Sequence, residues 1–385
     1  MTFFVAGVKR YKNIRSLSQL LLYFVTRPLY YLGFLIPKDP FIWVFGNTFG
    51  FKDNARYLFT YIRDNHPEIR PIWIANKDPK NTAIRFRYLR FSVIGIWLQY
   101  RAGVCFVSTG QSDLAGFTLA RTNIIQLWHG IPIKQILLDS PETLPFKKRS
   151  SLAYKISLKF LKSTLQRYSL IIASSETVQE RLASAFGLPK QRFEITGYPR
   201  HDILFENSKD CKKWILYAPT WRRSPHDALT ITNAICNHEF IDEIAKLGYK
   251  LWLSIHPLNK QIEEKFKHIR GLQIVADDQD VNYVLAQSEI LITDYSSIAV
   301  DFSMLNRKVI FYTPDMNEYL QERGIYDEFR TIIENNGTRS SDQVLQGIVS
   351  TYRDCCISSD VFFRYRDTHS RKRIVDIVKK KFITK

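Results

Sequence analysis

Short apolar runs alternate along this chain with longer stretches in which apolar residues recur at helical spacing. The short runs suit strands buried on both faces, and the periodic stretches suit amphipathic helices. We expect strands at 41–45, 72–75, 104–108, 123–127, 170–173, 193–196, 214–218, 250–255, 272–275, 290–293 and 308–312, and 85–90 is compatible with one. We expect helices at 54–63, 93–100, 178–186, 240–246, 281–286, 342–353 and 371–381. This alternation indicates parallel sheets covered by helices on both faces.

The pattern restarts after a polar stretch, Glu206–Lys213, which we interpret as a linker between two domains. A chain of 385 residues is also too long for one typical hydrophobic core. The sequence therefore predicts an α/β fold with two doubly wound, Rossmann-like domains at 39–205 and 206–365. We further expect a basic segment at 1–38, a basic helical insertion at about 141–168, and a basic C-terminal helix at 366–385.

The formal net charge of +18 calls for an anionic partner: nucleic acid, an anionic membrane or a phosphate-rich substrate. We find no helix-turn-helix, zinc-finger or RNA-binding pattern, so nucleic acid is not expected. Residues 1–37 hold five basic and no acidic residues among leucines and aromatic residues, and Arg27-Pro28 interrupts this run. Residues 147–167 hold seven basic and no acidic residues. Both stretches fit interfacial segments on an anionic membrane, or else amphipathic helices that pack on a core with their charges in solvent.

Composition narrows the class of protein further. A hydrophobic content of 45% excludes a disordered chain. The five cysteines, two of them adjacent at Cys355-Cys356, show neither metal-ligand spacing nor a disulfide framework, which favours a reducing compartment. We recognise no cleavable signal peptide and no long uncharged span.

Polar side chains directly follow several of the predicted strands, and ligands of doubly wound sheets bind at the carboxyl ends of strands. The residues in such positions are His129, Thr220, Arg222, His256, Asp294, Ser296 and Ser297. The last three precede a periodic run, so they either cap a helix or, with its free N–H groups, form a phosphate site. A cleft between two such domains is typical of GT-B transferases, which use nucleotide-diphosphate donors.

Five motifs occur in order along the chain. They are LWHGIPIK at 127–134, ITGYPRHD at 195–202, LYAPTWR at 216–222, IHP at 255–257 and ITDYSS at 292–297, followed by Asp301-Phe302 and FYTPD at 311–315. Together they resemble the CDP-glycerol glycerophosphotransferase family, which holds the teichoic-acid primases and polymerases and related capsule polymerases. The resemblance covers about residues 40–330 and leaves both ends of the chain without a motif.

The resemblance implies a GT-B-like fold, with an acceptor domain at 39–205 and a CDP-donor domain at 206–365. It also implies transfer of a polyol phosphate, glycerol phosphate foremost, from a CDP-activated donor to a hydroxyl of a lipid-linked or polymeric acceptor, with release of CMP. The enzyme would attach peripherally to the cytoplasmic face of the bacterial plasma membrane. CDP-glycerol and CDP-ribitol stay open as donors, and so do primase and polymerase as the type of activity.

The two motif histidines are the candidate catalytic residues. In the acceptor half, His129 has the ordinary pKa of a general base at neutral pH, and Gly130 would hold its loop in a fixed shape. In the donor half, His256 is suited to donate a hydrogen bond to the diphosphate. The structural alternatives are a hydrogen-bonded histidine beside Trp128 and a plain strand-end histidine before Pro257.

The remaining candidates are phosphate and cleft residues. Thr220 and Arg222 would contact phosphate oxygens, or else form a solvated turn. Asp294 would contact the donor polyol or cap the helix, with capping preferred. Three further residues, Pro199, Arg200 and Asp202, reach across the cleft or tie the linker to the first domain.

No metal and no cofactor are expected, because a helix start and basic groups can neutralise a diphosphate. Asp278-Gln279-Asp280 resembles the Asp-x-Asp of metal-dependent glycosyltransferases, but it precedes a predicted helix and is better read as a solvated acidic turn. Two other functions stay open: a GT-B glycosyltransferase that uses a nucleotide sugar, and a non-catalytic module that binds anionic lipid or polymer.

Overall fold

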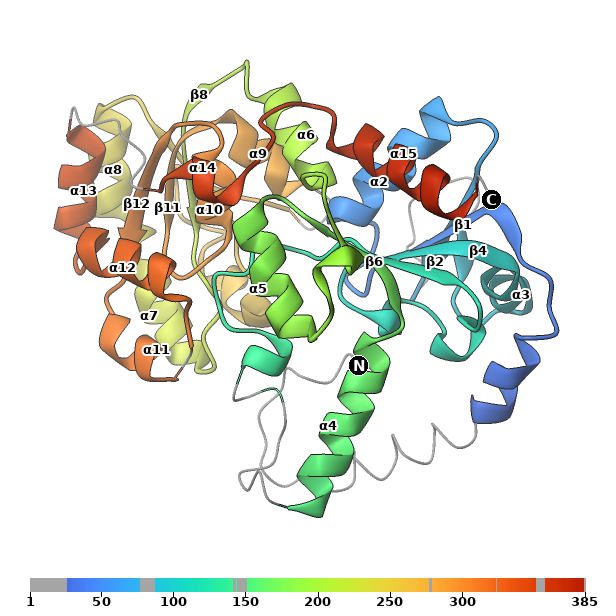
Figure 1. The fold of residues 1–385 in the computed structure, drawn as a ribbon. Coiled ribbons are helices and arrows are strands. Elements are labelled where there is room, and N and C mark those ends of the chain that lie inside the picture. Colours follow the sequence, from blue (N-terminus) through green and yellow to red (C-terminus); the bar gives the residue numbers. More distant parts are fainter. Residues whose placement is uncertain are drawn as a thin grey trace.

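Two parallel β-sheets form the two halves of the molecule (Figure 1). The computed structural model describes residues 26–76, 87–140, 143, 151–276, 279–322, 324–350 and 357–383. The first sheet has the strand order β3-β2-β1-β4-β5-β6-β7, and the second has the order β10-β9-β8-β11-β12-β13. The prediction of two doubly wound α/β domains is confirmed.

The strands coincide with the apolar runs of the sequence. The first sheet contains β1 (Asp39–Gly46), β2 (Arg70–Ala75), β3 (Arg87–Leu89), β4 (Ala102–Val107), β5 (Asn123–Gln126), β6 (Tyr168–Ala173) and β7 (Phe193–Ile195). The second contains β8 (Lys212–Ala218), β9 (Lys250–Leu253), β10 (Leu272–Ile274), β11 (Ser288–Thr293), β12 (Lys308–Tyr312) and β13 (Gly337–Thr338). Central strands are covered on both faces, which is why residues such as Trp43, Val44 and Phe45 are all fully buried.

Helices connect the strands and cover both sheets. In the first half these are α2 (Asp53–Asn65), α3 (Val93–Arg101), α4 (Leu152–Leu165), α5 (Glu176–Phe186) and α6 (Pro199–Asn207), with short 3₁₀ turns η1 (Gln111–Asp113), η2 (Gly116–Thr118), η3 (Leu137–Asp139) and η4 (Lys190–Arg192). In the second half they are α7 (Pro225–Ile235), α8 (His238–Lys246), the 3₁₀ segment η5 (Pro257–Lys265), α9 (Val281–Gln287), α10 (Ile298–Ser303), α11 (Met316–Glu322), α12 (Asp327–Asn336) and α13 (Ser341–Val349). The chain ends with α14 (Ser359–Phe362) and α15 (Ser370–Phe382).

One continuous apolar core joins the two halves. It contains Phe45 and Phe106 of the first sheet together with Leu291 and Phe311 of the second. A separate core lies on the far face of the second sheet, beneath α7, α8 and α13. Because the first core crosses the domain boundary, apolar packing helps to hold the two halves in one arrangement.

The predicted linker at Glu206–Lys213 is wrong in detail. Helix α6 continues to Asn207 and β8 already begins at Lys212. Only residues 208–211 form the turn between the two elements, and the polar residues on either side of it belong to the end of α6 and the start of β8. Helix α7 was also missed, although Ser224 and Pro225 are a helix cap and first-turn residue.

The C-terminal helix α15 returns to the first half of the molecule and lies beside α2 (Figure 1). Its first turn meets α6, where Asp202 accepts hydrogen bonds from the backbone N–H of Ser370 and of Arg371 at 2.9 Å each. Lys381 pairs with Glu194 at 2.6 Å. This basic helix therefore neutralises acidic residues of the first half. The predicted segment 1–25, most of 141–150, Asp278 and Cys355-Cys356 lie outside the described residues.

Candidate active site between the two domains

His129 lies on the loop that follows β5, at the face of the first sheet that meets the second half. Its Nδ1 lies 3.2 Å from the carbonyl oxygen of Ser108, which can only accept. We therefore assign the proton to Nδ1, which leaves Nε2 with a free lone pair. The residue is exposed to solvent in part, but the protein around the ring displaces much of the water next to it. This desolvation lowers the pKa of His129, the bond to Ser108 raises it, and the charge of Arg200 lowers it again.

Two buried polar residues hold the backbone of this loop. Asn54 donates to the carbonyl oxygen of Trp128 at 3.0 Å, and Trp128 has a φ of 54°, a conformation unusual for such a residue. Arg200 donates from Nη1 to the carbonyl oxygen of His129 at 2.9 Å. The amide of Asn54 also accepts from the backbone N–H of Arg200 at 3.1 Å, so the three segments are tied together.

His256 follows β9 in the second half and has the opposite arrangement of protons. Its Nδ1 accepts a hydrogen bond from the backbone N–H of Leu258 at 3.2 Å. Because that group can only donate, Nδ1 carries no proton and Nε2 must be the N–H donor. Burial lowers the pKa of His256 to about 4, with a contribution from the charge of Lys134, so the ring is neutral at physiological pH.

The loop after β8 is organised by a carboxylate and not by a helix cap. Asp294 accepts from the backbone N–H of Thr220 at 2.9 Å and from its hydroxyl at 2.5 Å. It also pairs with Nη2 of Arg222 at 2.9 Å. The preferred expectation that Asp294 caps the following helix is therefore wrong, because its carboxylate bonds to the loop that follows β8 and not to the first turn of α10.

Arg222 is buried and already engaged. Its Nε lies 2.6 Å from Asp315, and a third N–H donates to the carbonyl oxygen of Thr220 at 2.8 Å. Asn259 exchanges two hydrogen bonds with the backbone of Arg222, at 2.9 and 3.0 Å. The guanidinium therefore shapes the Thr220 loop. Asp315 belongs to the FYTPD motif, which was the available sequence signal for this partner.

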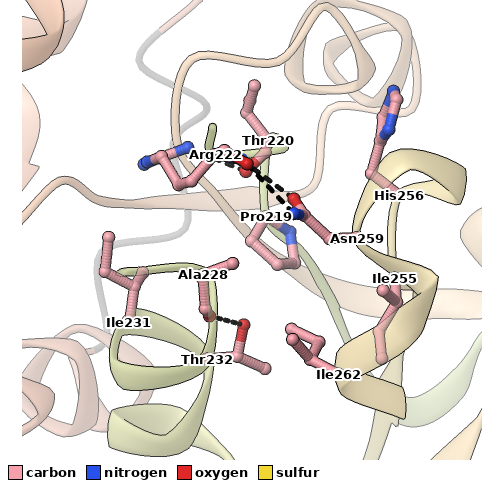
Figure 2. A pocket seen from close by; sticks show the side chains of 10 residues that line it. All are labelled: Pro219, Thr220, Arg222, Ala228, Ile231, Thr232, Ile255, His256, Asn259 and Ile262. Atoms are coloured by element: carbon pink, nitrogen blue, oxygen red, sulfur yellow. Dashed lines mark hydrogen bonds between the residues drawn. The ribbon is translucent and has the colours of Figure 1, made fainter. Parts of the chain in front are cut away.

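A small cavity lies beneath this loop (Figure 2). Its volume is about 10 Å³, and it is lined by Pro219, Thr220, Arg222, Ala228, Ile231, Thr232, Ile255, His256, Asn259 and Ile262. Figure 2 shows Thr220, Arg222 and His256 at one end and the apolar Ile262 at the other. A volume of this size holds about one water, so the cavity itself is too small for a nucleotide.

The serines at 296 and 297 begin a very short helix. Helix α10 has six residues, Ser297 makes no side-chain cap, and Ser296 accepts from the backbone N–H of Ile298 at 3.4 Å. A helix this short carries little dipole, so any contribution of the serines to phosphate binding rests on their hydroxyls. A Cβ added to Gly130 would lie 2.8 Å from Oγ of Ser297. The His129 loop and the Ser297 loop thus touch across the domain boundary.

The second motif divides between two roles. Arg200 crosses the boundary: its Nη2 lies 2.8 Å from Asp301 of α10, and its Nη1 lies 3.7 Å from Asp53 of α2. Pro199 is the first residue of α6, where its missing N–H costs nothing. Asp202 instead faces α15. Asn54 and Asp53 carry no local sequence signal that marks them as site residues, whereas Asp301 stands in the Asp301-Phe302 pair that follows the ITDYSS motif. Each of the three meets Arg200 from more than 100 residues away along the chain.

Among the described residues, no group of three or more His, Cys, Asp or Glu side chains could hold a metal ion. No helix within the described ranges has the length and apolar character needed to cross a membrane.

Comparison with known proteins identifies relatives of this chain and supports its fold. The family model described as CDP-Glycerol:Poly(glycerophosphate) glycerophosphotransferase matches residues 31–380. The chain is 27% identical over 352 residues to a teichoic acid poly(glycerol phosphate) polymerase of Bacillus spizizenii, which covers 82% of this chain and 85% of that protein. It is 25% identical over 397 residues to the corresponding polymerase of Bacillus subtilis, covering 90% of this chain and only 50% of that protein. The solved structure of the wall teichoic acid polymerase TagF superposes with a TM-score of 0.75 at 20% identity, over 97% of this chain and 99% of that one, and so supports the GT-B-like fold.

Proposed function

Because the chain belongs to the CDP-glycerol:poly(glycerophosphate) glycerophosphotransferase family, and is a transferase of that type, we propose its donor, acceptor and site as follows. The enzyme transfers glycerol phosphate, or else ribitol phosphate, from the CDP-activated polyol to a hydroxyl of a lipid-linked or polymeric acceptor. CMP is released, and the product is a teichoic-acid or capsule-type polymer. The step needs no cofactor beyond the CDP-polyol.

The observation that carries the proposal is the complementary hydrogen bonding of the two motif histidines, from which their protonation is assigned. The bond to Ser108 leaves Nε2 of His129 as a proton acceptor, and the bond from Leu258 leaves Nε2 of His256 as a proton donor. One ring comes from each domain, and the loops that follow β5 and β11 touch at Gly130 and Ser297. Transfer of a phosphoryl group to a hydroxyl requires one group of each kind.

In the proposed step, the acceptor hydroxyl oxygen attacks the distal phosphorus of the CDP-polyol and its proton passes to Nε2 of His129. The bond between that phosphorus and the bridging oxygen breaks, and CMP leaves with the electron pair. His256 donates its Nε2–H to a diphosphate oxygen, where negative charge grows. His129 then returns its proton to solvent.

On the donor side, the hydroxyls of Thr220, Ser296 and Ser297 are proposed to contact the diphosphate. Arg222 and Asp294 act through Thr220, since their buried ion pair sets the position of that hydroxyl. This assignment gives Arg222 a supporting role in place of a direct phosphate contact.

The experiment follows CMP release by the purified protein with CDP-glycerol, CDP-ribitol and a panel of nucleotide sugars. We expect CMP from a CDP-polyol, and turnover of a nucleotide sugar alone would replace the proposal with a glycosyltransferase. His129→Ala and His256→Ala should each lower kcat by about 10²- to 10⁴-fold, with unchanged circular dichroism. Near-normal turnover by a well-folded His129→Ala protein would remove His129 from the reaction.

We also propose that one side of the acceptor domain lies on the cytoplasmic face of the bacterial plasma membrane. Large apolar side chains are exposed on residues 29–35, next to and along α3, and on α4: Leu29, Tyr31, Leu32, Phe34, Leu35, Phe91, Val93, Ile94, Trp97, Leu152, Ile156 and Phe160. Helix α4 also exposes Lys155, Lys159 and Lys162. Arg167 lies 4.9 Å from the ring of Tyr30, which places the end of α4 beside the 26–36 segment. Exposed apolar groups, with exposed lysines among those of α4, fit an interfacial contact with anionic lipid.

Flotation with vesicles of anionic or zwitterionic lipid tests this surface. Replacing Leu152, Ile156 and Phe160 together by Ser should reduce binding to anionic vesicles. The matched control replaces Leu247, Tyr283 and Val349, three exposed apolar residues of the second half, in the same way. Equal binding by both variants would contradict the proposed membrane surface.

A further inference from the structure

A buried carboxylate lies next to the peptide group that accepts the hydrogen bond of His129. Asp113 ends the 3₁₀ turn η1, and its side chain is fully buried. It accepts hydrogen bonds from the backbone N–H of Thr48 at 2.8 Å, of Ser108 at 2.9 Å and of Thr109 at 2.8 Å. The hydroxyls of Thr48 and Thr109 donate to it as well, and the N–H of Gly110 lies 3.3 Å away.

One of these donors belongs to the peptide unit that holds the histidine. The N–H of Thr109 and the carbonyl of Ser108 are the two ends of a single peptide group. The N–H end donates to Asp113, and the carbonyl end accepts from Nδ1 of His129 at 3.2 Å. A carboxylate at the N–H end of an amide increases the negative charge on its carbonyl oxygen, because hydrogen bonds in a chain polarise one another.

We propose that Asp113 is a positioning residue for His129 and acts through the Ser108–Thr109 peptide group. The carboxylate, the peptide and the imidazole form a relay that fixes the Nδ1–H tautomer and makes Nε2 a stronger base. This inference rests on the proposed role of His129 as the base. In carboxylate–histidine pairs, a carboxylate bonded directly to the ring fixes its tautomer and raises its basicity. We infer that Asp113 has the same effect on His129 through one intervening peptide group.

Other charges near His129 belong to different elements and act differently. Arg200 of α6 bonds to the backbone carbonyl of His129 and lowers the pKa of the ring, whereas the charge of Asp113 raises it. Asp53 of α2 and Asp301 of α10 both face Arg200. Of Asp53, Asp113 and Asp301, Asp113 is therefore the acid that is hydrogen-bonded to the peptide group that accepts from Nδ1 of His129.

The experiment measures His129 directly by ¹⁵N NMR of histidine-labelled full-length protein, with its signals assigned by their loss in His129→Gln. Wild-type protein should show a protonated Nδ1 and an unprotonated Nε2 in neutral His129. The opposite tautomer in wild-type protein would overturn the proposal, and this arm does not depend on any variant being folded.

Asp113→Asn supplies the second arm. We expect the pKa of His129 to fall in this variant, so the acid limb of kcat/KM moves to lower pH, while kcat falls by about tenfold or more with little change in donor KM. Thr48→Val is the matched control, since it removes one donor to Asp113 at 2.6 Å and keeps the charge, so the limb should not move. A loss of kcat in Asp113→Asn with an unmoved His129 pKa would reduce Asp113 to a purely structural residue.

The two arms separate the relay from the function on which it rests. If His129→Ala stays active while Asp113→Asn still shifts the pKa of His129 in the NMR titration, the relay exists but the proposed base is wrong. If His129→Ala is inactive and the NMR signals of His129 ignore Asp113, the base is right and the relay is wrong.

Discussion

The buried ion pair between Arg200 and Asp301 joins the two domains next to the His129 loop, and the cost of removing it can be calculated. Nη2 of Arg200 lies 2.8 Å from the carboxylate of Asp301, and the two side chains are only 6% and 4% exposed. In Arg200→Met, Asp301 would keep only His201, whose Nε2 lies 3.2 Å away. Removing one partner of a buried pair costs about 3–5 kcal/mol, because the other charge stays buried without compensation.

This cost converts into a change that thermal unfolding can measure. For a unit of about 150–250 residues, 1 kcal/mol corresponds to about 2–4 °C in Tm, so Arg200→Met should lower Tm by about 6–20 °C. Circular dichroism during heating and urea unfolding are suitable assays. Lys190→Met is the control, since Lys190 pairs with Glu180 at 2.7 Å but both side chains are about 60% exposed, and it should leave Tm nearly unchanged.

A double variant tests the reasoning itself. Arg200→Met combined with Asp301→Leu replaces both charges by apolar groups, so it should recover much of the stability lost in either single variant. Strictly additive losses, or a Tm for Arg200→Met within about 2 °C of wild type, would refute the view that this pair is a buried, mutually dependent contact.

Three further predictions concern neighbouring groups. Burial raises the pKa of Asp53 from 3.8 to about 6 in the folded protein. The folded state therefore holds the proton of this carboxyl more tightly than the unfolded state does. The resulting stabilisation is fully present below the pKa of the unfolded chain and is lost as the pH rises through about 6. Asp53→Asn should therefore gain up to about 3 kcal/mol over wild type between about pH 4 and pH 8, and a pH-independent difference in urea unfolding would contradict this. Gly130→Ala should lower kcat without unfolding the protein, because the added Cβ would lie 2.8 Å from Oγ of Ser297 and force the two loops apart, and an unchanged kcat in steady-state assays would contradict this. Asp294→Asn should raise donor KM, since it weakens the hydrogen bond that positions the hydroxyl of Thr220. An unchanged KM would show that this hydroxyl does not contribute to donor binding.

Much of the architecture follows from local sequence. Buried parallel strands are continuous apolar runs, so Phe41–Phe45 and Ile290–Thr293 could be recognised without knowing their neighbours. The motif histidines and Thr220 follow strands directly, and strand ends in a doubly wound sheet meet at one edge. Helix α7 was missed because polar residues on an exposed helix face resemble a loop in composition. Helix α6 was missed as a whole, because it buries the polar residues Arg200, His201 and Asp202, whose partners lie far away in the sequence.

What the sequence by itself determined was the order of strands and helices and the residues that stand at strand ends, because both depend on periodicity over a few positions. Only the tertiary structure decided which nitrogen of His129 and of His256 carries the proton, since that depends on a carbonyl at Ser108 and an N–H at Leu258. It likewise decided that Arg222 is engaged by Asp294 and Asp315, and that Arg200 meets Asp301 a hundred residues away. Such pairings are set by strand order and by the packing of one domain on the other, and no local pattern along the chain encodes them.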